Sequence, residues 1–226
     1  MTKLSGAVVL VVGASGGLGS RISRQLADAG AIVVRAARNP QTLSGPDAYL
    51  ADLYTAGAPA SLIAAAINSH GKLDGLVIAA GAVAFGPLGS VSDATLQKLF
   101  TVNTIAPIQL IRDALPYLTE SAAAGRSPFV VTFSGVVSET PTAGIAAYSA
   151  SKAGLAAFTQ AASRELRRDG IRILDARPGH TETGLATRAL EGTAPAFPTG
   201  HNPDAVASRI VKAILDGEKD LPSTAF

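Results

Sequence analysis

Tyr148 and Lys152 are the residues whose types and spacing most directly indicate chemistry. Three small residues separate them, so on a helix both side chains leave the same face one turn apart. A free tyrosine has a pKa of about 10 and exchanges protons poorly at neutral pH. Because a nearby ammonium favours the phenolate, we expect Lys152 to lower the pKa of Tyr148 towards a useful range for acid–base catalysis. Tyrosine and lysine also meet at this spacing on ordinary surface helices, so the pair needs support from the rest of the chain.

A glycine-rich turn follows the first apolar run. Residues 7–12 (Ala-Val-Val-Leu-Val-Val) predict a strand that is buried on both faces, and residues 13–19 (Gly-Ala-Ser-Gly-Gly-Leu-Gly) lead from it into a helical pattern. A second apolar run over 31–37 predicts a neighbouring parallel strand. Glycines at such a turn let a pyrophosphate approach the backbone N–H groups of a helix N-terminus. The turn therefore predicts dinucleotide binding, with a purely structural turn as the alternative.

The end of the second predicted strand bears on which dinucleotide is bound. An acidic residue about 20 positions after the glycines would hold the ribose 2′-hydroxyl of NAD. Here the chain reads Ala36-Ala37-Arg38-Asn39, without a carboxylate. The guanidinium of Arg38 is well matched to a 2′-phosphate, so the sequence favours NADP(H) over NAD. The alternative is an ordinary solvated arginine at a strand end.

The rest of the chain alternates between strand and helix patterns. This alternation predicts an α/β fold: a Rossmann-like doubly wound parallel sheet, in three layers α/β/α, built as a single domain over 1–226. Residues 185–200 interrupt the pattern, and we expect them to form a flexible lid over the substrate site. Strands are expected over 48–53, 73–81, 129–134 and 171–176, helices over 62–67, 92–118, 145–168 and 202–215, and at most a short edge strand over 219–226.

Pro107 lies inside the long helix expected over 92–118. A proline has no N–H for the carbonyl four residues earlier, and its ring crowds that carbonyl. The residue four positions earlier is Asn103. The sequence therefore predicts a kink that leaves the backbone oxygen of Asn103 free for water or a ligand.

Composition narrows the class of protein. The chain is 47% apolar and only 16% charged, and its net charge of +2 with no basic run argues against nucleic acid as a partner. Cysteine is absent and the three histidines are scattered, so no disulfide and no metal site is expected. No apolar run approaches the ~20 residues of a membrane span, so we expect no membrane partner and a cytoplasmic location.

The order and separation of these motifs resemble those of the short-chain dehydrogenase/reductase family over essentially the whole chain. The resemblance implies a Rossmann fold and hydride transfer between a nicotinamide and a carbonyl or alcohol. The matching motifs are Gly13-xxx-Gly17-x-Gly19, Asp52-Leu53, Ala80-Gly81, Val102-Asn103, Tyr148-xxx-Lys152 and Pro178-Gly179.

The resemblance also implies roles for individual residues. Tyr148 would be the general acid in reduction, and Lys152 would bind the ribose hydroxyls beside the nicotinamide. Asn103 would hold a water in a proton relay to Lys152. Asp52 would meet the adenine, and Thr181 or Thr183 the nicotinamide amide. The residues expected to bind the cofactor are Gly13, Ser15, Gly17, Leu18, Gly19, Arg38, Asp52, Leu53, Ala80, Gly81, Tyr148, Lys152, Pro178, Gly179, Thr181 and Thr183.

One departure from the family pattern concerns the serine that orients the substrate. It usually lies about thirteen positions before the tyrosine, where this chain has Gly135. Ser134 is the neighbouring candidate and is taken here as a catalytic residue, although a one-residue offset on a strand would aim it at the opposite face. A bulge near the strand end would re-aim it. Ser138 and the absence of any such serine are the alternatives.

The sequence therefore predicts an NADP(H)-dependent oxidoreductase acting on a small or medium carbonyl or alcohol. The alternative is a non-catalytic NADP(H)-binding protein that serves as a regulator or assembly partner. Epimerisation or dehydration of nucleotide sugars is a third reading, but such enzymes usually carry a larger C-terminal substrate domain. The family resemblance also implies a homodimer or homotetramer.

Overall fold

All strands of the protein lie in one parallel sheet. The structure is a computed structural model that describes residues 1–226. The strands are β1 (Val8–Val12), β2 (Ile32–Ala37), β3 (Ala48–Leu50), β4 (Gly75–Ile78), β5 (Phe129–Phe133), β6 (Arg172–Ala176) and β7 (Asp220–Leu221). Their order across the sheet is β3-β2-β1-β4-β5-β6-β7, and every pair is parallel. The predicted α/β class with a doubly wound parallel sheet is confirmed.

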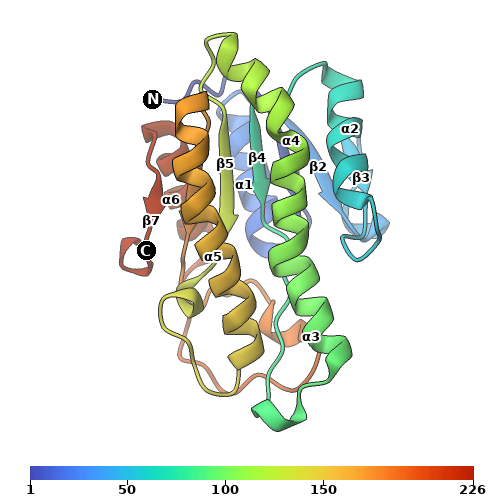
Figure 1. Ribbon diagram of the computed structural model, residues 1–226, viewed down its shortest axis with the longest axis vertical. Helices are drawn as coiled ribbons and strands as arrows, with labels where there is room; N and C mark the ends of the chain where they lie inside the picture. The colour runs from blue at the N-terminus through green and yellow to red at the C-terminus, as the bar shows by residue number, and fades with distance from the viewer.

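Helices cover both faces of this sheet (Figure 1). One face carries α1 (Gly17–Asp28) and α6 (Pro203–Asp216), which pack on each other, and the other carries α2 (Ala58–His70), α4 (Ala106–Ala123) and α5 (Ala146–Leu166). The short helix α3 (Asp93–Phe100) precedes α4 and projects beyond the carboxyl ends of the strands. These are the three layers that the sequence predicts.

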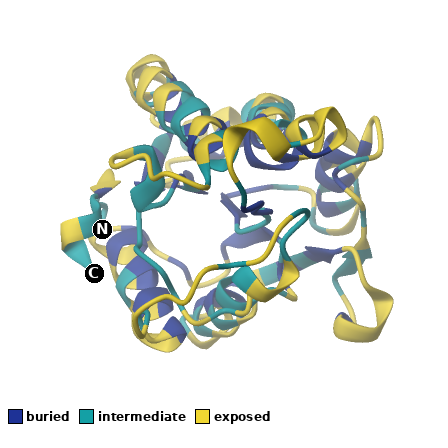
Figure 2. Cartoon of the chain, turned by 90° about the horizontal axis from the view of Figure 1, so that it is seen from below, coloured by how far each residue is buried: buried dark blue, intermediate teal, exposed yellow.

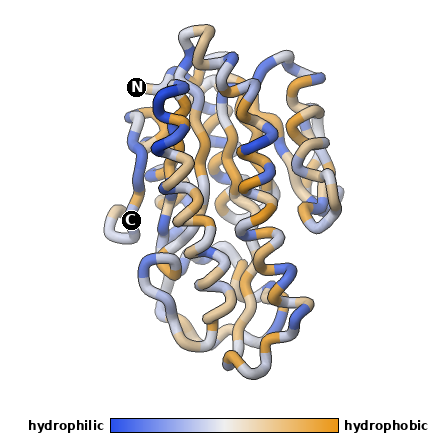
Figure 3. Tube along the Cα trace, viewed as in Figure 1, coloured by the Kyte–Doolittle hydropathy of each residue, from blue (hydrophilic) through white to orange (hydrophobic).

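The apolar run of β1 explains why it is the central strand. All five of its residues are buried because helices lie on both sides. Leu10 packs in the core under α2 and α4, whereas Val11 packs in the core under α1 and α6. Fully burying a side chain of this size contributes about 1.5–3 kcal/mol. Hydrophobic segments accordingly run through the middle of the molecule (Figure 3).

The predicted interruption of the long helix takes the form of a wide turn. Residues Thr101–Ile105 form a π-helical turn between α3 and α4, and Pro107 follows at the start of α4. Such turns keep the helix continuous while displacing backbone groups from their ordinary partners. The chain is therefore helical without a break from Asp93 to Ala123.

The parallel strands bring their carboxyl ends to one edge of the sheet. Figure 2 looks onto this edge, where loops surround buried strand ends. The strand order reverses between β1 and β4, since β2 and β3 lie on one side of β1 and the later strands on the other. Open α/β sheets bind ligands outside the carboxyl ends at such a reversal.

Candidate active site

A cleft of about 640 Å³ opens at the carboxyl ends of the strands. Loops after β1, β2, β3, β4, β5 and β6 line it, together with the start of α5. Of the predicted site residues, Gly19, Asn103 and Ser134 do not line the cleft. Those that do are Gly13, Ser15, Gly17, Leu18, Arg38, Asp52, Leu53, Ala80, Gly81, Tyr148, Lys152, Pro178, Gly179, Thr181 and Thr183.

The turn after β1 has no room for a side chain at Gly13 or at Gly17. A Cβ on Gly13, whose φ is +86°, would lie 2.6 Å from the backbone nitrogen of Ala80. A Cβ on Gly17 would lie 2.5 Å from the Cβ of Thr183. Helix α1 begins here with Gly16 as its N-cap, without a side-chain cap and without an acidic residue in its first turn. Its free N–H groups therefore face the cleft as an anion site, which fits the pyrophosphate of a dinucleotide.

Gly19 packs against the backbone of the turn at Gly13 and Ala14. A Cβ at this position would lie 2.1 Å from the carbonyl oxygen of Gly13. Gly19 is buried and faces the turn, not the cleft. The structure gives Gly19 a packing role, which is to let helix α1 approach β1 closely, and its contact with the cofactor stays a prediction.

Arg38 lies in the part of the cleft beyond β2. Its side chain is exposed, has no carboxylate partner, and lies over the ring of Tyr54 at 5.9 Å from the centroid. Asp52 accepts a hydrogen bond of 3.1 Å from the backbone N–H of Tyr54. Burial raises the pKa of the Tyr54 hydroxyl. These residues present an unpaired guanidinium and an aromatic face to a ligand in this end of the cleft.

Tyr148 and Lys152 line the cleft from the first turns of helix α5. Lys152 is only 6% exposed, and its Nζ donates a hydrogen bond of 2.7 Å to the carbonyl oxygen of Phe133. Burial lowers the pKa of Lys152 to about 8 and raises the pKa of Tyr148 to about 12. The expectation that Lys152 lowers the pKa of Tyr148 is therefore wrong, because desolvation dominates and the ammonium binds a backbone carbonyl.

Asn103 supports the site through its side chain. It is fully buried in the wide turn and donates from Nδ2 to the carbonyl oxygen of Ala82 at 2.9 Å and to Ser151 Oγ at 3.0 Å. Its Oδ1 accepts from the backbone N–H of Ala82 at 3.0 Å. Asn103 thus joins the segment after β4 to the first turns of α5. Its partner on α5, Ser151, lies between Tyr148 and Lys152 in the chain. Sequence reasoning considered only its backbone oxygen and missed this contact.

Ser134 points away from the cleft. It is fully buried, and its Oγ donates a hydrogen bond of 2.5 Å to Asp175 Oδ2. Gly135, with φ +71° and ψ 165°, lines the cleft instead. The hydroxyl of Ser138 donates to the carbonyl oxygen of Gly135. The prediction of Ser134 as a catalytic residue is contradicted because the strand keeps its alternation up to Gly135. Ser138 does not line the cleft either.

The segment over 185–200 lines the cleft, but it is fastened at several points. Leu190 N–H donates to the carbonyl oxygen of Val83, and Phe85 N–H donates to that of Glu191. Phe197 stacks on His180 with ring centroids 4.7 Å apart and lies 6.0 Å from the ring of Phe85. These contacts hold the segment as one wall of the cleft, and its movement as a lid stays a prediction.

Sequence reasoning missed several other residues in the cleft. Arg188 donates to the carbonyl oxygen of Gly184 at 3.0 Å, and no carboxylate pairs with it. Thr142 supplies the hydroxyl that the segment between β5 and α5 contributes to the lining. Neither residue belongs to a motif, and only folding brings them to the cleft.

Comparison with known proteins agrees with the fold and with the family resemblance of the sequence. Residues 7–193 match the family model described as short chain dehydrogenase. The chain belongs to the short-chain dehydrogenase family. It is 33% identical to the ketoacyl reductase HetN of Nostoc sp., in an alignment that covers 95% of this chain and 77% of that protein.

Solved short-chain dehydrogenase structures share the fold. A metagenomic short-chain oxidoreductase in complex with NADP is 30% identical, with a TM-score of 0.78 and 98% of both chains covered. The 3-ketoacyl-(acyl-carrier-protein) reductase of Brucella melitensis, complexed with NADH, superposes with a TM-score of 0.85 over 98% of this chain and 99% of that one, at 22% identity. Family membership makes nicotinamide-dependent oxidoreduction the expected class of activity. None of the helices has the length and apolar composition needed to cross a membrane.

Proposed function

We propose that the protein is an NADP(H)-dependent reductase of a small or medium carbonyl compound, with Tyr148 as the general acid. The observation that supports this most directly is that Tyr148 and Lys152 share one cleft with the glycine turn and the unpaired Arg38. Acid–base groups, an anion site and a cation for a further phosphate then lie around a single ligand volume.

Different residues of the cleft would bind different parts of the cofactor. The N-terminus of α1 would hold the pyrophosphate, Arg38 the 2′-phosphate, Asp52 the adenine, Lys152 the nicotinamide ribose, and Thr181 or Thr183 the amide. The nicotinamide, when bound, supplies or accepts the hydride. Gly13 and Gly17 keep the turn bare enough for this approach.

Tyr148 would transfer the proton. Its pKa of about 12 keeps the phenol protonated at neutral pH, which favours proton donation to a carbonyl oxygen in the reductive direction. Lys152, with a pKa of about 8, carries its ammonium at neutral pH. Because Ser134 faces away, polarisation of the carbonyl depends on Tyr148, with Thr142 as the other hydroxyl on that side of the cleft.

The substrate end of the cleft is mostly apolar. Gly135 leaves open space in the wall of the cleft, since the nearest atom to a Cβ there, the carbonyl oxygen of Pro178, would be 3.8 Å away. We therefore expect a carbonyl attached to an apolar body. The surrounding side chains are those of Phe85, Val136, Val137, Ile145, Leu185 and Phe197.

The test is NADPH oxidation across a panel of aldehydes and ketones with apolar substituents. Tyr148→Phe should abolish turnover while NADPH still binds with unchanged affinity, because the phenol oxygen acts on the substrate. Undiminished turnover by Tyr148→Phe would remove Tyr148 from the mechanism. The protein is further expected to act in the cytoplasm. It is also expected to form a homodimer or homotetramer, and analytical ultracentrifugation would measure this oligomeric state.

The orientation of Ser134 favours a second candidate function. A cleft without that hydroxyl fits a non-catalytic NADP(H)-binding protein that serves as a regulator or assembly partner. This alternative predicts tight NADPH binding and no turnover with any member of the panel.

A further inference from the structure

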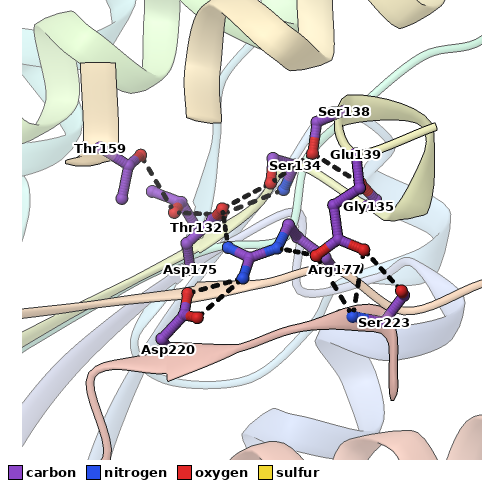
Figure 4. Close-up of polar contacts among 10 residues, drawn as sticks. All are labelled: Thr132, Ser134, Gly135, Ser138, Glu139, Thr159, Asp175, Arg177, Asp220 and Ser223. Atoms are coloured by element: carbon purple, nitrogen blue, oxygen red, sulfur yellow. Dashed lines mark hydrogen bonds and ion pairs between the residues drawn. The ribbon is translucent and has the colours of Figure 1, made fainter. Parts of the chain in front are cut away.

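A buried carboxylate lies behind the catalytic pair. Asp175 on β6 is only 5% exposed and lies beside Thr132 of β5 in the register of the sheet. It accepts hydrogen bonds from Thr132 Oγ1 at 2.9 Å, from Ser134 Oγ at 2.5 Å and from Arg177 Nη1 at 3.1 Å (Figure 4). Three side-chain donors therefore surround this buried carboxylate, where an unpaired polar group would be costly. No role predicted from the sequence includes it.

One peptide group connects this carboxylate to Lys152. The N–H of Ser134 donates to Asp175 Oδ1 at 3.3 Å, and the carbonyl oxygen of Phe133 accepts from Lys152 Nζ at 2.7 Å. This N–H and this carbonyl belong to the same peptide unit. Its dipole therefore lies between the carboxylate and the ammonium, with its positive end towards Asp175 and its negative end towards Lys152.

Such an arrangement strengthens the hold on the ammonium. Hydrogen bonds in a chain polarise one another, and the low dielectric of a buried site increases the effect. Burial lowers the pKa of Lys152, whereas the charge of Asp175 acts in the opposite direction. No carboxylate contacts Lys152 directly, so this indirect partner matters more than it would on a surface.

Further charged residues hold Asp175 in place through Arg177. Arg177 also binds Glu139 and, at 2.8 Å, Asp220 of β7, while Ser223 donates to Glu139 at 2.5 Å. The network therefore joins β6, the segment between β5 and α5, and the C-terminal residues (Figure 4). Around Lys152 the titratable groups are Tyr148 on its own helix, Asp175 on β6 and, beyond Asp175, the Arg177 cluster.

We propose that Asp175 is a positioning residue that holds the Lys152 ammonium in place and charged through the peptide group between Phe133 and Ser134. This gives the buried Ser134 a role in holding Asp175. The proposal depends on the proposed oxidoreductase function only in giving Lys152 a part in catalysis, since the contact exists without substrate.

The first experiment measures the titration of Lys152 directly. The chain has six lysines, so ¹³C-lysine NMR of the full-length protein can follow Lys152, with Lys152→Arg to assign its signal. Asp175→Asn keeps an acceptor for the Ser134 N–H but removes the charge, and we expect it to lower the pKa of Lys152 by about one pH unit. Glu139→Gln is the matched control, because it removes a carboxylate of the same cluster that does not contact this peptide, and it should leave the titration unchanged. An unchanged titration in Asp175→Asn would overturn the proposal.

A second variant has the opposite sign. Arg177→Gln removes the cation that offsets Asp175, so the pKa of Lys152 should rise, and this result decides the question if Asp175→Asn does not fold. In the active enzyme, the high-pH limb of kcat/KM should move to lower pH in Asp175→Asn and stay in place in Glu139→Gln. A shifted NMR titration without turnover on any substrate would refute the proposed function and leave the role of Asp175 intact. Turnover with an unshifted titration would do the reverse.

Discussion

Replacing Arg38 with glutamine tests how the cleft distinguishes the two nicotinamide cofactors. Arg38 follows β2, is exposed and has no carboxylate partner, so its guanidinium is available to a ligand. NADPH and NADH differ only in the 2′-phosphate. If Arg38 binds that phosphate, Arg38→Gln will weaken NADPH binding and leave NADH binding unchanged.

The magnitude follows from the kind of contact. A hydrogen bond to a charged group contributes about 1.5–3 kcal/mol, which corresponds to roughly a 10- to 150-fold change in affinity. Because Arg38 is exposed, water and salt screen the interaction, so the loss should be near the lower end at about 0.15 M salt and grow as salt is removed. The contact of Arg38 with the Tyr54 ring is lost equally for both cofactors.

Fluorescence titration of NADPH and NADH against wild type and variant gives both dissociation constants. Arg112→Gln is the matched control, because Arg112 is an exposed arginine on α4 that lies outside the cleft, so it removes the same charge at a distance. Equal losses for the two cofactors in Arg38→Gln, or no loss for NADPH, would refute the assignment of the 2′-phosphate to Arg38.

Two further predictions concern Lys152 and Gly135. Burial lowers the pKa of Lys152 to about 8, so the ammonium is present below that pH and is lost above it. NADPH affinity should therefore be constant below about pH 7, begin to fall near pH 8 and be about 10- to 100-fold lower by pH 10. Lys152→Met should show no such dependence in the same titrations, and a flat wild-type curve contradicts this role. Gly135→Ser should lower the free energy of unfolding by about 1–3 kcal/mol in urea, because φ +71° with ψ 165° is a region that almost only glycine adopts, although space for a Cβ exists. Gly135→Ala should lose a similar amount, and an undiminished stability in both variants would show that the backbone there is not strained.

Local patterns explain why much of the molecule was predictable. The unbroken aliphatic run of β1 can only be satisfied between two helical layers, so it identified the central strand. The glycines after β1 predicted the turn. At Gly13 and Gly17 neighbouring atoms lie so close that no residue with a side chain fits. Tyr148 and Lys152 share a helix, and residues at this spacing stay neighbours wherever the helix packs.

The remaining features depend on packing between distant segments. Asp175 and Arg188 belong to no local pattern, and their environments follow from the pairing of β5 with β6 and from the path of the chain after β6. The pKa of Tyr148 was predicted in the wrong direction because spacing gives proximity and not burial. Asn103 was predicted from the proline that follows it, whereas its side-chain partners lie 21 and 48 residues away.

The glycine at position 135 and the carboxylate of Asp175 belong to one local arrangement. β5 alternates regularly to its end, so Thr132 and Ser134 face α5, and the hydroxyl that would otherwise serve a substrate serves Asp175 instead. The positive φ of Gly135 then turns the chain along the cleft without placing any side chain there. The end of β5 therefore has no hydroxyl on the substrate side. The hydroxyl of Ser134 lies instead behind the Phe133–Ser134 peptide, whose carbonyl oxygen binds Lys152. A site built in this way relies on the charge of Lys152 and the proton of Tyr148 for its polarity, and it leaves the space beside Gly135 to the apolar part of a substrate.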